Sequence, residues 1–216
     1  MEREQLVEKT SAFVKNKLEG AEAGHDWWHT YRVWKAAVKI GTEENADLLV
    51  VELGALLHDI ADSKFYDGDE EIGPTIAREF LESLGVEKEI MEKVEFIIRN
   101  ISFKGGFNNP VNPTLELQVV QDADRLDALG AIGIARTFNY GGFKNRPLHD
   151  PSIPPEHYKD REAYKNSQAP TINHFYEKLL LLKDKMNTKV GKGLAKQRHE
   201  FMEAYLNQFF KEWEGN

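Results

Sequence analysis

Apolar residues recur at helical spacing through almost the whole chain, and this periodicity restricts the fold more than any other feature. In the first such stretch, residues 2–19, the side chains of Leu6, Phe13 and Leu18 are expected to point inward. Further helices are expected at residues 26–43, 46–60, 73–84, 87–101, 114–129, 130–142, 170–186 and 188–214. The sequence therefore predicts an all-α protein.

Two segments lack this periodicity. Residues 102–113 (SFKGGFNNPVNP) contain four Gly or Pro and three Asn, a composition typical of a loop. Residues 143–169 form a longer irregular stretch, which we expect to be either a lid over a functional site or a disordered surface loop. Neither segment marks a defensible domain boundary, so residues 1–216 are expected to form a single domain.

Charge and composition exclude several functions. The net charge of −8 argues against nonspecific nucleic-acid binding, but it allows a small anionic substrate because local charge at a site can oppose the net charge. The chain has no cysteine, which excludes disulfides and a thiolate zinc site. Its start, MEREQLVEKT, lacks the features of a signal peptide, and no apolar run approaches the ~18 residues of a membrane span. A cytoplasmic protein without membrane association is expected.

Two imidazoles and two carboxylates offer the donors of one metal site: His29, His58, Asp59 and Asp124. This mixed nitrogen and oxygen set suits one divalent transition metal, namely Mn, Co, Ni, Fe or Zn, and suits Mg less well. Four protein ligands on a six-coordinate ion leave about two open positions, which can hold water and a substrate oxygen.

The apolar surroundings of these residues support a metal role. His58 and Asp59 interrupt the apolar run LLVVELGALLHDIA in the expected helix 46–60. A polar group on an apolar stripe is costly unless it is paired or bound to a metal. Asp124 also falls on an apolar stripe of its helix, whereas Asp122 and Asp127 have more polar neighbours. Of these three aspartates, Asp124 is expected to point inward.

The order of the four residues resembles the HD superfamily of metal-dependent phosphohydrolases, and more closely its small stand-alone bacterial hydrolases. A His is followed after 29 residues by the His-Asp pair of LLHDIADSKF, and the Asp of QDADRLDALGA follows 65 residues later. The resemblance implies an HD-domain helical bundle that hydrolyses a phosphoester or phosphoanhydride bond. It also favours His29 as the ligand over His25, which could chelate with His29 at i, i+4 spacing but is expected at the helix start.

The set of candidate ligands disfavours two alternative functions. No histidine occurs between Ile60 and Ala123, where HD proteins with several metals carry extra ligands, so a mononuclear site is expected. A metal-dependent oxygenase on the same fold is disfavoured because a second, His-rich iron site is missing. A non-catalytic protein that retains the metal and senses phosphate is disfavoured because all four ligands are intact.

Further residues are candidates for catalysis and substrate binding. Asp59 can hold the attacking water, and Asp62, at i+4 from His58, is either the general base or a surface carboxylate. The candidate phosphate contacts are Lys64, Lys104, His174 and Lys178. His174 is equally compatible with a buried structural role.

The expected substrate is a small phosphorylated compound. A nucleotide is the first choice because aromatic residues near the loops could stack on a base: Phe103, Phe107, Phe138 and Tyr140. These aromatics are equally ordinary as core residues. Arg125 is expected to form a structural salt bridge. The closing segment RHEFMEAYLNQFFKEWEG is expected either to pack in the core or to form the face of a homodimer.

Overall fold

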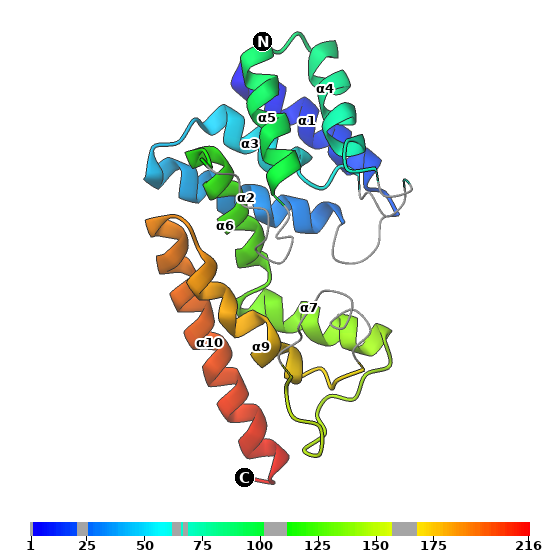
Figure 1. Cartoon of the computed structure of the whole chain (residues 1–216), viewed down its shortest axis with the longest axis vertical. Coiled ribbons are helices and arrows are strands. Elements are labelled where there is room, and N and C mark those ends of the chain that lie inside the picture. The colour runs from blue at the N-terminus through cyan, green and yellow to red at the C-terminus, as the bar shows by residue number, and fades with distance from the viewer. Residues whose placement is uncertain (1, 21–25, 62–65, 67–68, 102–111, 157–167) are drawn as a thin grey trace. The chain divides into compact units, whose positions relative to one another are not determined.

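Every regular element among the described residues is a helix, as the periodicity predicts (Figure 1). The computed structural model describes residues 2–20, 26–61, 66, 69–101, 112–156 and 168–216. None of the described helices combines the length and the apolar character that crossing a bilayer would need.

The chain divides into two compact units, Met1–Asp124 and Arg125–Asn216. The first contains α1 (Arg3–Lys17), α2 (Trp27–Glu44), α3 (Leu48–Leu57), α4 (Ile72–Ser83), α5 (Lys88–Asn100) and most of α6 (Leu115–Asp127). The second contains α7 (Gly130–Phe143), α9 (Asn173–Glu177), the 3-10 helix η2 (Leu179–Lys185) and α10 (Lys189–Trp213). Each unit is described below by itself, and the single domain stays a prediction.

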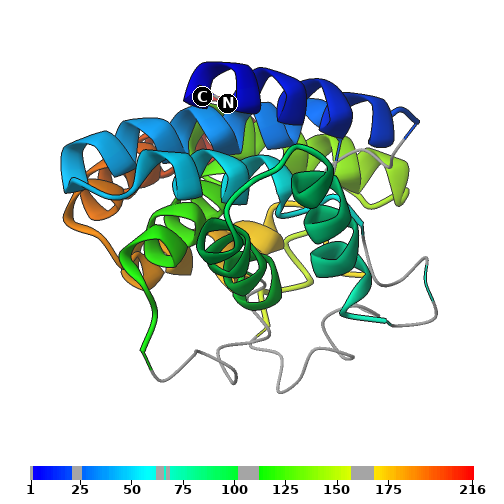
Figure 2. The ribbon, with the colours of Figure 1, turned by 90° about the horizontal axis from the view of Figure 1, so that it is seen from above.

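Helix α3 forms the centre of the first unit. Its sequence, LLVVELGALL, is apolar apart from Glu52, and every residue from Val50 to Leu57 is buried. It packs against α1, α2 and α5, and it lies beside α2 in both ribbon views (Figures 1 and 2). Gly54 permits the close approach of α5, because a Cβ at this position would lie 2.8 Å from Ile97 Cδ1.

One buried carboxylate links three helices of the first unit. Glu52 of α3 accepts hydrogen bonds from Arg3 Nε of α1 at 2.7 Å and from Trp34 Nε1 of α2 at 3.1 Å. A buried charge is tolerated when it is paired in this way. Helix α3, which leads into the His-Asp pair, is therefore held by packing and by the polar contacts of Glu52.

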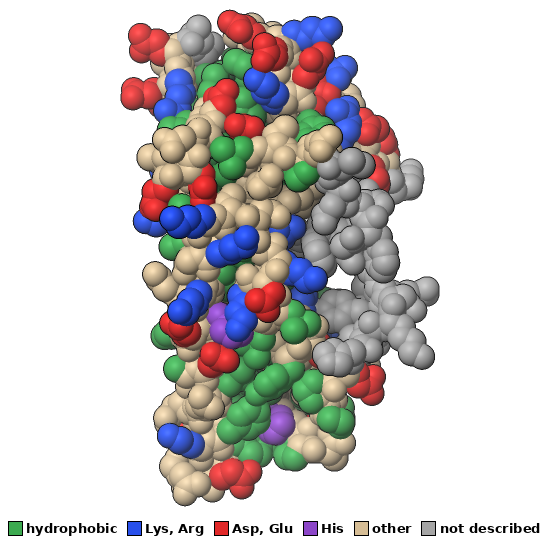
Figure 3. Space-filling model, turned by 60° about the vertical axis from the view of Figure 1, so that its left-hand side comes forward, with side chains coloured by type: hydrophobic (Ala, Val, Ile, Leu, Met, Phe, Trp, Pro, Cys, Tyr) green, Lys and Arg blue, Asp and Glu red, His purple; other side chains and the backbone are tan. Residues whose placement is uncertain are grey.

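A cluster of aromatic rings connects three helices of the second unit. Phe138 of α7 lies 6.0 Å from Phe175 of α9 and 6.1 Å from Tyr205 of α10, measured between ring centroids. Tyr205 thus packs on the buried ring of Phe175, whereas Phe201 and Trp213 of the closing helix are exposed, so core packing accounts for only part of this segment. Hydrophobic side chains also reach the surface of the molecule (Figure 3), and a homodimer stays a prediction.

Two expected helices have different bounds in the structure. The helix expected at 46–60 ends at Leu57, so His58 and Asp59 occupy the turn that follows it. The helix expected at 170–186 is divided into α9 and the 3-10 helix η2. Its first turn is absent because the N–H groups of Thr171 and Ile172 donate to the carbonyls of Pro147 and Leu148. At Lys178, φ is −142°, which ends the α-helical conformation.

The two expected loops are described only in part. Residues 102–111 lie outside the described residues, and 112–114 lead into α6. Of the stretch 143–169, residues 157–167 lie outside the described residues. The choice between a lid and a disordered loop therefore stays open.

Candidate metal centre

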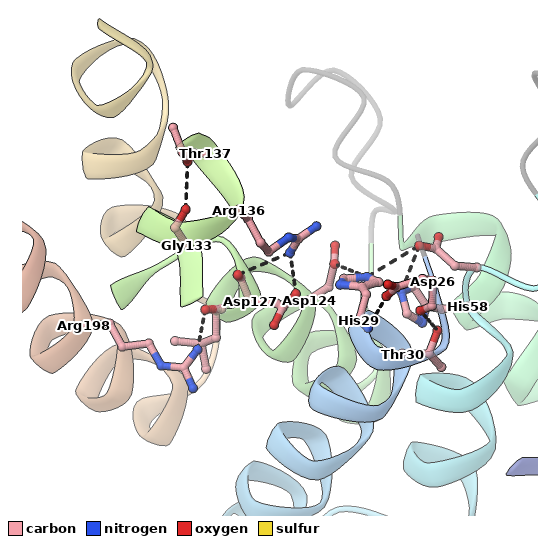
Figure 4. A network of polar contacts seen from close by, with 12 residues as sticks. Asp26, His29, Thr30, His58, Asp124, Asp127, Gly133, Arg136, Thr137 and Arg198 are labelled. Carbon is pink, nitrogen blue, oxygen red and sulfur yellow. Dashed lines mark hydrogen bonds and ion pairs between the residues drawn. The ribbon is translucent and has the colours of Figure 1, made fainter. Parts of the chain in front are cut away.

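His29 lies in the first turn of α2, where an N-cap residue positions the backbone. Asp26 is the N-cap, and its Oδ1 accepts a hydrogen bond from the His29 N–H at 2.8 Å (Figure 4). This bond satisfies one of the N–H groups that a helix start leaves unpaired. The His29 side chain is buried. Asp26 thus starts this helix, and His25, which was expected at the helix start, lies outside the described residues.

His58 is buried directly after the last residue of α3. Its Nδ1 donates to the carbonyl oxygen of Ala55 at 2.8 Å. A ring whose Nδ1 donates to a backbone carbonyl presents its Nε2 as the metal-binding atom, an arrangement common around bound metals. The Nε2 atom of His58 lies 3.3 Å from the Nε2 atom of His29.

Two carboxylates complete the group. Asp59 Oδ2 lies 3.4 Å from His58 Nε2 and 3.5 Å from His29 Nε2. Asp124 Oδ1, from α6, lies 3.5 Å from His29 Nε2. The structure thus brings together His29 of α2 with His58 and Asp59 of the turn after α3, and it places Asp124 of α6 beside His29.

These distances fit a bound divalent metal. Ligand atoms at about 2.0–2.2 Å from one ion lie roughly 3.0–3.5 Å from each other, which follows from tetrahedral and octahedral geometry. The four measured separations lie between 3.3 and 3.5 Å. Within the described parts of the chain, one group of donor atoms lies close enough together to hold a metal, and it consists of His29, His58 and Asp59.

The electrostatics of the group favour a cation. Burial lowers the pKa of His58, but the charge and hydrogen bond of Asp59 and the charge of Asp124 outweigh burial and raise this pKa to about 9. The metal-free ring therefore holds a proton at neutral pH. A cation that binds Nε2 has to displace this proton. The negative charge of the two carboxylates, which stabilises the proton, would also stabilise a metal ion.

The sequence predicts that Asp124, and not Asp122 or Asp127, points inward. The burial of the three side chains shows that this prediction is wrong. Asp122 and Asp127 are both buried, whereas 37% of the Asp124 side chain is exposed. Asp127 can be buried because it forms an ion pair with Arg136, a partner that helical periodicity does not reveal. Asp124 Oδ1 nevertheless lies 3.5 Å from His29 Nε2, a separation that two ligands of one metal can have.

The other predicted site residues are placed only in part. Asp62, Lys64 and Lys104 lie outside the described residues. His174 and Lys178 belong to the second unit, where Lys178 is exposed. The predictions for these five residues therefore stay predictions.

His174 has a basic environment that sequence reasoning missed in part. Its burial and the nearby charges of Lys178 and Arg146 lower its pKa to about 3, so its ring is neutral at physiological pH. Arg146, in the segment FKNRPLHD, was not among the predicted residues, and nothing in its local sequence distinguishes it from other basic residues. Arg125 is buried and donates to the carbonyl of Lys185 at 2.6 Å, which is a structural contact.

Comparison with known proteins agrees with the site. The HD domain family model matches residues 27–129, the range that holds all four candidate ligands. The uncharacterized protein YpgQ of Bacillus subtilis is 38% identical over 210 residues, which cover 97% of this chain and 94% of YpgQ. The chain therefore belongs to the HD superfamily of hydrolases.

Solved structures show the same relationship. An HD-superfamily hydrolase from Bacillus thuringiensis matches with a TM-score of 0.81 and 45% identity, and the match covers 100% of both chains. The structure of B. subtilis YpgQ in complex with ADP matches with a TM-score of 0.76 and 37% identity, covering 98% of this chain and 97% of YpgQ.

Proposed function

We propose that this protein is a metal-dependent phosphohydrolase that cleaves a phosphoester or phosphoanhydride bond in a small substrate, first of all a nucleotide. The convergence of His29, His58 and Asp59 at separations of 3.3–3.5 Å, with Asp124 at 3.5 Å from His29, carries this proposal. One divalent transition metal held by these residues would lower the pKa of a bound water and polarise a phosphoryl oxygen.

The burial of the four ligands indicates where substrate approaches. The two histidine side chains are almost completely buried, whereas 24% of the Asp59 side chain and 37% of the Asp124 side chain are exposed. Water and a phosphoryl group therefore reach the site from the side of the carboxylates. Asp59 is then placed to accept a hydrogen bond from the attacking water and to orient it.

We assign supporting roles to the remaining predicted residues. Asp62 acts as the general base or orients the water, and Lys64 and Lys104 contact the phosphate. In the second unit, Lys178 supplies positive charge and His174 supplies a neutral imidazole, which can donate a hydrogen bond to phosphate without a change of protonation. Cations near a phosphoryl group stabilise the negative charge of its transition state.

The nucleotide substrate is supported by a relative. YpgQ, 37% identical to this chain in the structural match, has a structure in complex with ADP. A nucleotide offers the phosphoanhydride bond that the proposed reaction cleaves. This chain's negative net charge of −8 requires that local basic groups attract such an anion.

A metal-by-substrate screen tests the proposal. Chelator-treated protein would be supplied with Mn, Co, Ni, Fe, Zn or Mg and with nucleoside mono-, di- and triphosphates, and phosphate and pyrophosphate release would be measured separately. We expect release with one or two of the transition metals and on a narrow set of nucleotides. Asp59→Ala should abolish metal binding and activity together, and activity that survives without metal would contradict the site.

The metal content of the protein and its turnover in this screen together separate the alternatives. Two irons per chain would favour an oxygenase, and one bound metal with no turnover on any nucleotide would favour phosphate sensing. Glu89→Gln, which removes an exposed carboxylate on α5 that pairs with Lys93, serves as the control and should leave metal content and turnover unchanged.

A further inference from the structure

Trp28 exposes a large aromatic surface beside the metal group. It is 59% exposed, and among the described residues of the first unit no large hydrophobic residue is more exposed. Trp28 directly precedes His29, so the Cα atoms of the two residues lie about 3.8 Å apart. Both belong to the first turn of α2, which the N-cap Asp26 fixes. Tryptophan offers a large amphipathic surface and is enriched where proteins bind partners.

Burial along α2 shows which side of His29 faces solvent. The residues on one side of His29 belong completely to the core, namely Thr30, Val33 and Ala37. Trp28 lies on the other side, about 100° round the helix from His29, and Lys35 on the same side is exposed too. Asp59 and Asp124 are partly exposed, so the metal group itself opens to solvent. On α2, the open side of His29 is therefore the side that carries Trp28.

Neighbouring aromatic rings hold the indole of Trp28. The rings of Trp28 and Tyr31 are nearly perpendicular, with an interplanar angle of 78° and centroids 5.8 Å apart. Tyr31 makes a similar contact with Trp34, at 80° and 6.0 Å, and Trp34 Nε1 donates to the buried carboxylate of Glu52 at 3.1 Å. Aromatic pairs favour this edge-to-face arrangement. A side chain held in this way loses little freedom when a ligand binds, so Trp28 is a preorganised contact.

A nucleotide has an aromatic base as well as charged phosphates, and the metal group accounts only for the phosphates. Every base has a π-face that can stack on an aromatic side chain. Of the four aromatic residues that the sequence suggests for this contact, two lie outside the described residues and two belong to the second unit: Phe103, Phe107, Phe138 and Tyr140. Trp28 belongs to the same unit as the metal group and lies on its open side.

We propose that Trp28 is a substrate-binding residue whose indole stacks on the base of a nucleotide while the metal group holds the phosphates. The inference rests on the proposed function and adds recognition of the base to it. Stacking tolerates any base, so Trp28 would distinguish nucleotides from phosphate compounds without a base, rather than one base from another. Loss of one stacked contact should weaken nucleotide binding by about 5–100-fold.

Binding of two ligands that differ by the nucleoside tests this inference. The first is α,β-methylene-ADP and the second is methylenediphosphonate, and the bridging carbon of both resists hydrolysis. Calorimetry on Mn²⁺-loaded protein should show that Trp28→Ala weakens the first ligand by about 5–100-fold and leaves the affinity for the second within about twofold. The affinity for Mn²⁺ itself, titrated separately, should also stay within about twofold, because the neighbouring His29 is unchanged.

Two further variants separate stacking from a structural role. Trp28→Phe keeps an aromatic ring, so it should retain most of the affinity for α,β-methylene-ADP, and it remains informative if Trp28→Ala does not fold. This ligand should quench part of the tryptophan fluorescence of wild type, and Trp28→Phe should lose the quenching although it still binds. Trp213→Ala is the matched control, since Trp213 is a 44% exposed tryptophan at the end of α10, and it should change neither affinity.

The outcomes distinguish this inference from the proposed function. Unchanged affinity of Trp28→Ala for α,β-methylene-ADP, or equal weakening of both ligands, would overturn the base contact. Metal-dependent turnover of nucleotides by wild type would still support the proposed function in that case. Conversely, wild-type protein that shows the expected dependence on Trp28 but hydrolyses no phosphoester or phosphoanhydride would overturn the proposed function and leave the base contact in place.

Discussion

The Nδ1 atom of His58 donates a hydrogen bond of 2.8 Å to the carbonyl oxygen of Ala55, one turn earlier in the chain. This bond selects the ring orientation in which Nε2 faces His29 Nε2 at 3.3 Å. The two imidazoles therefore converge because α3 ends at Leu57, which frees the chain to place His58 and Asp59 in the following turn.

The convergence predicts that His58 is indispensable for metal binding. In His58→Gln, the amide is a poor substitute for the imidazole nitrogen, and Mn²⁺ affinity should fall by at least about 100-fold. His199→Gln is the control, because His199 and His58 are each only 5% exposed. Titration calorimetry of both variants should show the loss in His58→Gln alone, and an equal loss in both would indicate a general folding defect.

The N-cap of α2 supports His29 in a similar way. Asp26→Ala removes the acceptor of the His29 N–H bond and should cost about 1 kcal/mol of stability. Thr188→Ala removes the N-cap bond to Gly191 at the start of α10 and should have a comparable cost. Only Asp26→Ala should also weaken Mn²⁺ binding. Urea unfolding and metal titration of the two variants check this, and equal metal affinity in both would show that the N-cap does not position His29.

His174 predicts a pH dependence of stability. Its folded pKa is lowered to about 3, whereas an unfolded histidine titrates near 6.5. Between these values the unfolded chain binds the extra proton, so this residue makes stability fall as the pH falls below about 6.5, by at most ~1.4 kcal/mol per pH unit. Above this pH its contribution is constant.

Urea unfolding of metal-free protein at several values between about pH 5 and 6.5 measures this effect. His174→Gln cannot take up the proton, so its stability should depend less on pH than that of wild type. Identical slopes for the two proteins would show that His174 is not held neutral by its surroundings.

The close contact of Gly54 with Ile97 predicts that alanine at this position destabilises the protein, whereas alanine at Gly193 should have the opposite effect. Gly54→Ala places a methyl group against Ile97, and overpacking of this kind should cost about 1–3 kcal/mol. Gly193→Ala, on α10, meets no heavy atom within 4 Å and should stabilise the protein by about 0.5–1 kcal/mol. Thermal unfolding of both variants should give shifts of opposite sign, and a stabilised Gly54→Ala would contradict the packing of α3 on α5.

The sequence predicts the class of the fold well, and it indicates a candidate ligand set, because both depend on local patterns. Helical periodicity gives most helices to within a few residues, and the His, His-Asp, Asp order gives the four donors. What the sequence does not reveal depends on tertiary partners. The burial of Asp127 requires Arg136, and the late start of α9 requires backbone bonds from Thr171 to Pro147.

The end of α3 shows the same limit on a smaller scale. The run LLVVELGALLHDIA continues the apolar pattern through His58, so periodicity extends the helix too far. The hydrogen bond from His58 to the Ala55 carbonyl joins residues within one turn, yet only the path of the chain in the structure reveals it. Arg146 near His174 is likewise evident only once two distant segments pack together.

Anomalous diffraction from crystals soaked in Mn²⁺ tests the central claim most directly. The account predicts one strong peak per chain, within about 2.5 Å of the Nε2 atoms of His29 and His58 and of a carboxylate oxygen from each of Asp59 and Asp124. A peak at a different group of residues, or no peak at these four in crystals that diffract well, would contradict it.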